Sequence, residues 1–288
     1  MSSSTLLLLG LLSIAQAKSP DALPDQPDAL GPAKQLSPSV VLHEVVLEKG
    51  KEKRLWLYLP SGWRSRPDKI PCIFIAPAGS RGYHGKRLEE ADRAEHVPYA
   101  EAGFAVVPYE VDGYLPKEYG DAELPKAMKD FKASKAGVLN GKSALDWALK
   151  NLPCIDKAHV YAAGHSSAGT LALLLAESDR RVKGCIAYAP VVDVPRKLEA
   201  WLPQGEVALP GYRKFVVETC ALKNAGKLKC PLFIHCSEND RAYITKGITE
   251  LVLVLRDVNK DVTHVRVSEG DHYSAMIQDG LPRGIQWI

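Results

Sequence analysis

Residues 161–175 read YAAGHSSAGTLALLL and place two adjacent serines between two glycines. The apolar residues before this pair are typical of a short buried strand, and those after it are typical of a helix. A chain that passes from a strand into a helix across one serine presents that hydroxyl at the carboxyl end of the strand. The stretch therefore indicates an α/β fold and raises the question of which serine occupies the turn.

Steric crowding distinguishes the two serines. In such a turn the residues two before and two after the nucleophile approach each other closely, so both must be small. Gly164 and Ala168 flank Ser166 in this way, whereas a turn at Ser167 would place the imidazole of His165 at the crowded position. The pattern therefore predicts Ser166 as the nucleophile and His165 as a packing residue beside it.

The rest of the chain alternates between short apolar runs and helix-like stretches. Two alternating runs at 41–47 and 54–59, joined by a lysine-rich turn, predict an antiparallel hairpin. Later apolar runs are separated by helix-like segments, which is typical of a parallel sheet covered on both faces. We therefore expect an α/β fold with an open, mostly parallel sheet of about eight strands and helices on both faces.

Candidate catalytic partners follow two later strands, because ligands in open α/β sheets bind beyond the carboxyl ends of the strands. The run PLFIHC is followed by SEND, in which Asp240 is the expected acid and Glu238 its close rival. The run VTHVRVS is followed by EGDHY, where Gly270 permits a tight turn and His272 is the expected base. A serine nucleophile needs a histidine base, and that base needs a carboxylate to fix its tautomer.

Two further acids lie near these positions, and each has a different expected role. Asp193, after the run CIAYAPVV, is an alternative to the expected acid, whereas Asp271 is expected to be a loop acid. The chain order Ser, Asp, His, with each residue just past its own strand, is the order expected of α/β-hydrolases.

The run IFIA leads into Pro77-Ala78-Gly79-Ser80, where such a fold places one oxyanion donor. The backbone N–H of Ala78 or Gly79 is expected to act together with that of Ser167. Ser167 also begins a helix, whose positive end favours a developing oxyanion.

The first 17 residues predict a secretion signal. They hold no charged side chain and a short apolar run, and they end in Ala15-Gln16-Ala17, a pattern that signal peptidase accepts. We expect cleavage after Ala17 and a secreted or periplasmic protein without a membrane span; a buried N-terminal helix is the alternative. Residues 18–40 are rich in proline and predict a disordered tether, so residues 41–288 form the expected catalytic domain.

Composition argues against several classes of partner. The formal net charge is +3 with dispersed basic residues, so nucleic acid is not expected to bind. The sequence has no CxxC or HExxH pattern, and no metal or other cofactor is expected. Cys72, Cys185 and Cys236 lie in apolar runs and behave as small hydrophobic residues, whereas Cys220 and Cys230 flank a polar segment and are a candidate disulfide pair.

Three motifs together resemble dienelactone hydrolases and the catalytic domains of prolyl-oligopeptidase-type enzymes, both of the α/β-hydrolase superfamily. These motifs are GHSSAG after HVYAA, SEND after PLFIHC, and EGDHY near the end of the chain. The resemblance extends from residue 41 to the C-terminus and implies Ser166 as nucleophile, Asp240 as acid and His272 as base. Ala168 departs from it, since the family usually has glycine there, and so does the oxyanion turn, which is PAGS and not an HGGG-type run.

The resemblance implies a secreted serine hydrolase that cleaves small-molecule carboxylic esters through an acyl-enzyme. A peptidase of short peptides is one alternative, although too few residues precede the catalytic part for the propeller of full-length oligopeptidases. A catalytically inactive binding protein with the same fold is the other.

Segments 81–87, 114–135 and 201–212 are expected to roof the site, with Trp201 and Tyr212 as candidate pocket residues. The sequence predicts no particular oligomeric state.

Overall fold

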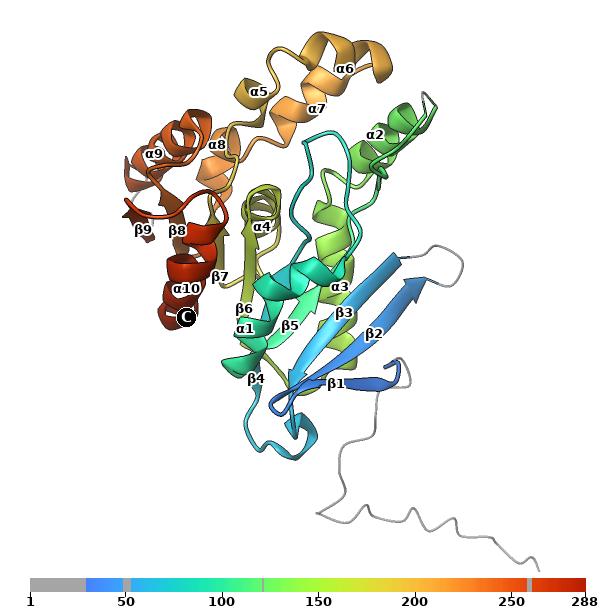
Figure 1. Cartoon of the computed structure of the whole chain (residues 1–288), viewed down its shortest axis with the longest axis vertical. Coiled ribbons are helices and arrows are strands. Elements are labelled where there is room, and N and C mark those ends of the chain that lie inside the picture. Colours follow the sequence, from blue (N-terminus) through green and yellow to red (C-terminus); the bar gives the residue numbers. More distant parts are fainter. Residues whose placement is uncertain (1–29, 49–52, 121, 258–260) are drawn as a thin grey trace, which may run out of the picture.

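The computed structural model describes residues 30–48, 53–120, 122–257 and 261–288 (Figure 1). The predicted secretion signal and the first part of the predicted tether, residues 18–29, lie outside these ranges. Within them the chain forms one sheet of nine strands, one more than the approximate number expected, with helices packed against it. The predicted α/β fold is confirmed.

The sheet is antiparallel at one end and parallel through the rest. Its strands run in the order β1-β2-β3-β5-β4-β6-β7-β8-β9. The first three pair antiparallel, β3 meets β5 antiparallel at Tyr58 and Val106, and all later neighbours pair in parallel. The predicted hairpin is thus confirmed as β2 and β3. The strands are β1 (Ala33–Ser37), β2 (Val40–Glu48), β3 (Lys53–Pro60), β4 (Ile70–Ile75), β5 (Ala105–Pro108), β6 (Ile155–His165), β7 (Gly184–Tyr188), β8 (Leu232–Ser237) and β9 (Val262–Val267).

Strand β1 corrects the prediction that residues 18–40 form a disordered tether. Its five residues lie between Pro32 and Pro38 and pair with β2 at the edge of the sheet. The side chain of Gln35 secures this edge, because its Nε2 donates to the carbonyl oxygen of Val40 at 3.2 Å and to Ser61 Oγ at 3.0 Å. Proline is compatible with an edge strand, where a missing backbone donor faces solvent, so a Pro-rich composition did not prevent pairing here.

Helices cover both faces of the sheet and enclose two hydrophobic clusters. On one face, α1 and α10 contribute Tyr99 and Leu281; on the other, α3, α4 and α9 contribute Leu145, Leu173 and Leu251. The helices are α1 (Arg93–Glu101), α2 (Glu123–Ala133), α3 (Val138–Asn151), α4 (Ser167–Ser178), α5 (Val194–Lys197), α6 (Leu202–Ala208), α7 (Tyr212–Glu218), α8 (Ala221–Asn224), α9 (Ala242–Asp257) and α10 (Leu281–Trp287), with 3-10 turns at Trp63–Ser65, Glu90–Asp92 and Ala225–Lys227 and a π-helical turn at Met276–Gly280.

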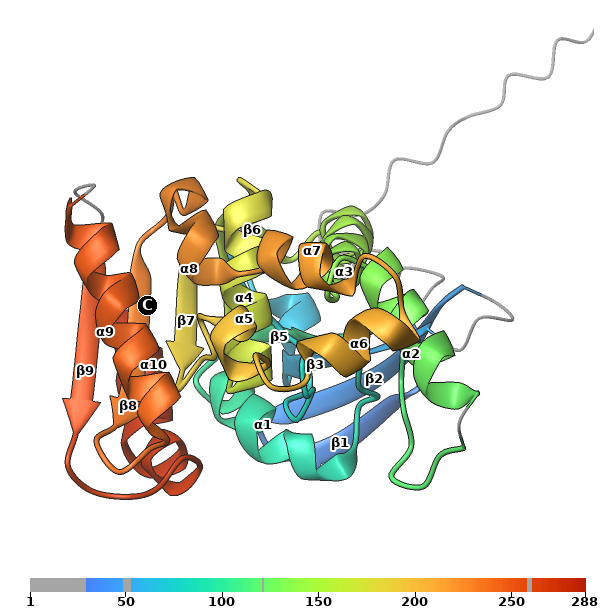
Figure 2. The same ribbon diagram turned by 90° about the horizontal axis from the view of Figure 1, so that it is seen from above.

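Three of the four short helices between β7 and β8 form a separate layer. In the view from above, α5, α6 and α7 lie together over the middle of the sheet (Figure 2). Each of α5 and α6 contacts α7. Within the described residues, no helix is both long and apolar enough to cross a lipid bilayer.

The candidate disulfide between Cys220 and Cys230 is absent, and all six cysteines are free thiols. Cys220 is buried, and its Sγ donates to the carbonyl oxygen of Val192 at 3.4 Å. Helix α8 and the following 3-10 turn lie between the two cysteines in the chain. This folded segment separates the two thiols, although they are only ten residues apart in the sequence.

Burial of His96 links the stability of the fold to pH. His96 lies on α1, is 1% exposed, and packs beside the rings of Trp56 and Tyr58. Desolvation lowers the pKa of His96 to about 3, whereas the ordinary value in an unfolded chain is about 6.5. The folded protein therefore holds this imidazole neutral, and the unfolded chain takes up a proton first as the pH falls.

We predict that His96→Phe makes the protein less sensitive to acid. The stability due to a neutral His96 is fully present above about pH 6.5 and is lost as the pH falls toward 3, by up to about 1.4 kcal/mol per pH unit. Urea unfolding of both proteins at pH 7.0, 5.5 and 4.5 measures this slope. The explanation fails if the free energy of unfolding of the variant falls with pH as steeply as that of the wild type.

Candidate active site

Ser166 forms a strained turn between β6 and α4. Its backbone has φ 56° and ψ −118°, outside the regions that residues with a side chain usually adopt. Its N–H donates to the carbonyl oxygen of Tyr188 at 2.8 Å. A Cβ atom on Gly164 would lie 2.5 Å from the carbonyl carbon of Ala168, so this position must be glycine. The close approach of these flanking residues is the one expected around Ser166.

Ala168 occupies the position where the resembling family usually has glycine. It is buried at 2% exposure, and a Cβ on Gly164 would lie only 2.8 Å from its own Cβ. Because Gly164 has no side chain, there is room for the methyl group of Ala168. The strained turn therefore forms even though Ala168 is not a glycine.

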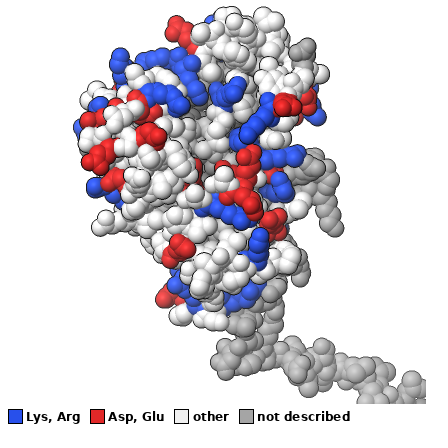
Figure 3. All heavy atoms as spheres, viewed as in Figure 1, with Lys and Arg blue, Asp and Glu red and all other residues white. Residues whose placement is uncertain are grey.

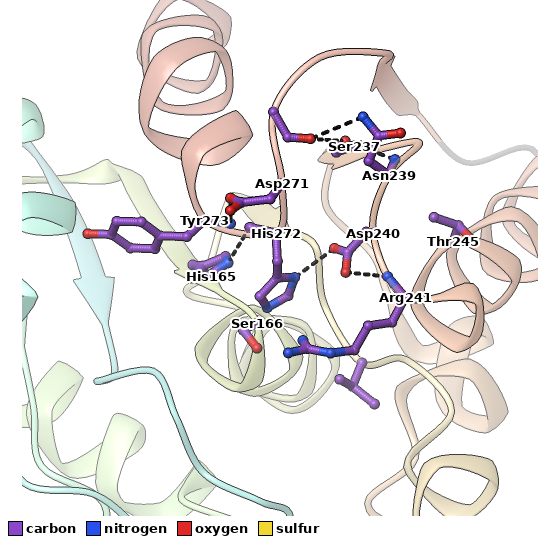
Figure 4. Close-up of polar contacts among 12 residues, drawn as sticks. His165, Ser166, Ser237, Asn239, Asp240, Arg241, Thr245, Asp271, His272 and Tyr273 are labelled. Atoms are coloured by element: carbon purple, nitrogen blue, oxygen red, sulfur yellow. Dashed lines mark hydrogen bonds and ion pairs between the residues drawn. The ribbon is translucent and has the colours of Figure 1, made fainter.

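Hydrogen bonds fasten the loop after β8 to the loop after β9. The Oγ of Ser237, the last residue of β8, donates to the carbonyl oxygen of Gly270 at 2.7 Å and accepts the N–H of Asn239 at 3.0 Å. The side chain of Asn239 in turn donates to the carbonyl oxygen of Ser268 at 2.8 Å. Gly270 has a φ of 75°, which permits the turn that follows. These contacts hold the two loops at a fixed separation (Figure 4).

The structure brings Asp240 and His272 into direct contact. Nδ1 of His272 donates to Oδ2 of Asp240 at 2.6 Å. The Asp240 side chain is fully buried and that of His272 is 20% exposed. Figure 4 shows the imidazole between Asp240 and Ser166, in a position where its second nitrogen faces the serine. Within the described residues no hydrogen bond joins Ser166 Oγ to this ring, and such bonds are often long in enzymes without substrate.

Asp271 stabilises the turn that carries His272. Its Oδ1 accepts hydrogen bonds from the N–H of Tyr273 at 3.0 Å and from the N–H and Oγ of Ser274 at 2.7 Å. These bonds, mainly those from Ser274, lower the pKa of Asp271 to about 2. The carboxylate therefore stays ionised and capped to the backbone beside the imidazole, as a loop acid.

The two rival acids lie elsewhere. Glu238 is exposed and pairs with Arg266 at 3.4 Å. Asp193 caps α5 by accepting the N–H of Arg196 at 3.1 Å. Neither carboxylate contacts the imidazole, so of the three candidate acids Asp240 is the one that the structure brings to His272.

The hydroxyl of Ser167 has a role that the sequence did not indicate. Its Oγ accepts hydrogen bonds from the N–H groups of Gly79 and Ser80, each at 2.9 Å. The N–H of Gly79 is thus directed at Ser167, whereas that of Ala78 has no hydrogen bond within the described part of the chain. Of the two expected donors in this turn, Ala78 is the one available to an oxyanion, together with the N–H of Ser167 at the start of α4.

His165 packs against the imidazole of His272 and holds its backbone. Its Nε2 donates to the carbonyl oxygen of His272 at 2.9 Å, and the two ring centres lie 4.6 Å apart. Its Nδ1 lies 3.5 Å from Oε1 of Glu95, and both side chains are nearly buried. His165 was expected to pack beside the nucleophile; the contribution of Glu95 from α1 was not expected, because the two are far apart in the sequence.

A cavity of about 50 Å³ lies beside the strained turn. Its wall is largely apolar and includes Val111, Phe131 and Leu171, with Ser167 at its border. Segments 81–87 and 114–135 both contribute to it, as expected of loops that roof the site.

Trp201 and Tyr212 make other contacts and do not line this cavity. Trp201 stacks on Tyr83 with ring centres 4.4 Å apart and meets Tyr212 edge-on at 5.3 Å. Tyr212 is fully buried and donates from its hydroxyl to the carbonyl oxygen of Gly82 at 2.8 Å. The two aromatic residues therefore fix the loop after β4 to α6 and α7, and they act on the cavity only through that loop.

In the described part of the chain, no three His, Cys, Asp or Glu side chains cluster as a metal site would require.

Comparisons with known proteins identify the architecture. No protein-family model matches the sequence, and no curated protein has significant sequence similarity to it. Among solved structures, an acetyl xylan esterase from Paenibacillus sp. R4 is similar with a TM-score of 0.64 and 16% identity, over 91% of this chain and 89% of that one.

Two other solved structures differ in how much of them this chain covers. A putative dienelactone hydrolase from Klebsiella pneumoniae subsp. pneumoniae MGH 78578 has a TM-score of 0.62 and 17% identity, over 86% of this chain and 98% of that one. The acylaminoacyl peptidase of Pyrococcus horikoshii has a TM-score of 0.65 and 14% identity, over 86% of this chain and 40% of that one. With its nine-stranded sheet, the chain has the fold of the α/β-hydrolases.

Proposed function

We propose that this protein is a serine hydrolase that cleaves carboxylic esters through an acyl-enzyme. The observation that carries the proposal is the 2.6 Å hydrogen bond from His272 to the buried Asp240, with the same imidazole facing Ser166 (Figure 4). A histidine oriented by a carboxylate is the base that a serine hydroxyl requires to become nucleophilic.

In the first half of the reaction, Nε2 of His272 accepts the proton of Ser166 Oγ as this oxygen attacks the ester carbonyl carbon. Asp240 keeps the remaining proton of the ring on Nδ1 and stabilises the imidazolium that forms. The negative charge on the carbonyl oxygen is bound by the N–H groups of Ser167 and Ala78. Removal of one such donor typically costs about 3 kcal/mol of transition-state stabilisation.

Collapse of this intermediate breaks the bond to the alcohol, which leaves with the proton from His272. The acyl group remains on Ser166 as an ester. Water then attacks the acyl carbon as it gives a proton to His272, and the second collapse releases the acid and restores the serine hydroxyl.

Two observations favour an ester over a peptide as the substrate. The esterase and the putative dienelactone hydrolase are covered over most of their own length, whereas the peptidase extends well beyond the similar part. The cavity beside Ser167 is small and mainly apolar, which suits an acyl chain. Export of the enzyme is a separate proposal that rests on the sequence of residues 1–17.

We predict that Ser166→Ala abolishes labelling by a fluorophosphonate and lowers kcat toward a short 4-nitrophenyl ester by about 10⁶-fold. Ser167→Ala is the matched control, because it removes the neighbouring hydroxyl and leaves the nucleophile. It should still be labelled, with slower turnover as the oxyanion turn loosens. Labelling that persists in Ser166→Ala would rule out this nucleophile, and a wild-type protein that is never labelled would favour an inactive binding protein.

We predict that Asp240→Asn lowers kcat by about 10³- to 10⁴-fold, because an amide no longer holds the proton on Nδ1 of His272. Glu238→Gln, two residues earlier and exposed, should stay within about twofold of the wild type. Ester turnover and near-ultraviolet circular dichroism together measure the effect and confirm folding. Equal losses in the two variants would refute the role of Asp240.

Parallel assays with short peptide anilides test the peptidase alternative.

A further inference from the structure

The cavity beside the strained turn has an apolar wall but carries a lysine on its border. Lys197 is the last residue of α5 and lines this cavity together with Ser167, Val191 and Val194. Within the described residues its ammonium group makes no hydrogen bond or ion pair. A partly buried cation is costly when no anion accompanies it, so the absence of a partner needs an explanation.

The adjacent residue shows what an ordinary surface cation does in this helix. Arg196 pairs with Asp193, the N-cap residue of the same helix, at 3.1 Å and with Glu250 of α9 at 2.9 Å. Lys197 lies next to Arg196 in the chain but faces the cavity. Of the two cations in α5, the one without a partner in the described residues is therefore the one that borders the cavity.

Two arginines lie close enough to Lys197 to repel its positive charge. Burial, followed by the positive charges of Arg241 and Arg81, lowers the pKa of Lys197. Arg81 hydrogen-bonds the hydroxyl of Tyr83 at 3.4 Å, and the side chain of Arg241 extends beneath the His272 ring toward Ser166 (Figure 4). Neither arginine forms an ion pair with a carboxylate in the described part of the chain.

Lys86 adds a fourth cation to the surroundings of the cavity. It also lines the cavity and pairs with the exposed Glu89 at 3.2 Å. Figure 3 shows Lys and Arg side chains gathered on the upper part of this face, over α5 and its neighbours. The net charge of the whole chain is only +3, so this concentration of positive charge is local.

Building on the proposed function, we infer that the substrates are esters that carry a carboxylate in addition to the scissile ester, and that Lys197 binds this carboxylate. The apolar wall accommodates the carbon chain between the two groups. Arg241 and Arg81 strengthen the positive potential at the entrance, and a bound carboxylate relieves the repulsion among the three cations. A neutral ester of the same length gains only the apolar contacts.

Two pairs of substrates test this inference. The first pair varies the acyl group of the ester: mono-4-nitrophenyl adipate ends in a carboxylate, whereas 4-nitrophenyl hexanoate ends in a methyl group. The second pair varies the alcohol part of the ester: 3-acetoxybenzoate carries a carboxylate, whereas 3-acetoxybenzamide carries a neutral amide. The wild-type enzyme should show at least a tenfold higher kcat/KM for the charged member of one pair, and the pair concerned shows which half of the substrate enters the cavity.

Variants of α5 assign the preference to Lys197. Lys197→Gln should lower the charged-to-neutral ratio of kcat/KM at least fivefold, and Lys197→Glu should bring it below one. Arg196→Gln, one residue earlier, should leave the ratio within about twofold of the wild type. Thermal unfolding of each variant confirms that the comparison is made between folded proteins.

The outcomes separate this inference from the proposed function. Turnover of the neutral esters with no preference in either pair would overturn the inference and leave the hydrolase proposal intact. A preference that survives in Lys197→Glu would also overturn it, because the carboxylate would then be bound elsewhere. No turnover of any ester would overturn the proposed function, and this inference with it.

Discussion

The contact between Gly164 and Ala168 is the constraint on which the site depends. The chain can leave β6 and enter α4 across a single residue only because no side chain stands at Gly164, where even a Cβ would lie 2.5 Å from backbone atoms. This crossing forces Ser166 into a positive φ and directs its side chain beyond the edge of the sheet. The strained backbone is held in place by the hydrogen bond from the serine N–H to the carbonyl oxygen of Tyr188, a buried residue at the end of β7.

The residues proposed to act with Ser166 are positioned by the parallel sheet and then by local hydrogen bonds. Strands β8 and β9 end side by side, so the loops that follow them meet at the same edge as the strained turn. Ser237 and Asn239 then tie one loop to the other, and His165 holds the backbone of His272 from the opposite side. The imidazole is therefore restrained through its own side chain and through its backbone, which favours a preorganised site.

The candidate site residues that the sequence predicted are those whose positions depend on a few neighbouring residues in the chain. The choice between Ser166 and Ser167 depended on side-chain size two residues away, and Asp240 and His272 each follow directly on an apolar strand. The same rules predicted the mostly parallel sheet, because continuous apolar runs alternate with helical segments. These features needed no knowledge of which distant segments meet.

Features that depend on distant contacts were missed or misjudged. Strand β1 forms because β2 offers it an unpaired edge, which its own Pro-rich sequence does not reveal. Trp201 and Tyr212 were predicted as pocket residues, but Trp201 stacks on Tyr83 and Tyr212 donates a hydrogen bond to Gly82, in a loop more than a hundred residues earlier in the chain. Likewise, Glu95 meets His165 only after α1 has packed against the sheet. The sequence indicates which environment each residue type favours, but the tertiary structure determines which residues it contacts.

The hydroxyl of Ser167 joins the turn at Gly79 and Ser80 to the residue next to Ser166. The two halves of the proposed oxyanion site are consequently coupled through one oxygen atom, and they cannot move apart independently when the surrounding loops rearrange. A serine hydrolase of the proposed kind can therefore exchange the loops that recognise its substrates, because the alignment of its two N–H donors is kept by the strained turn itself.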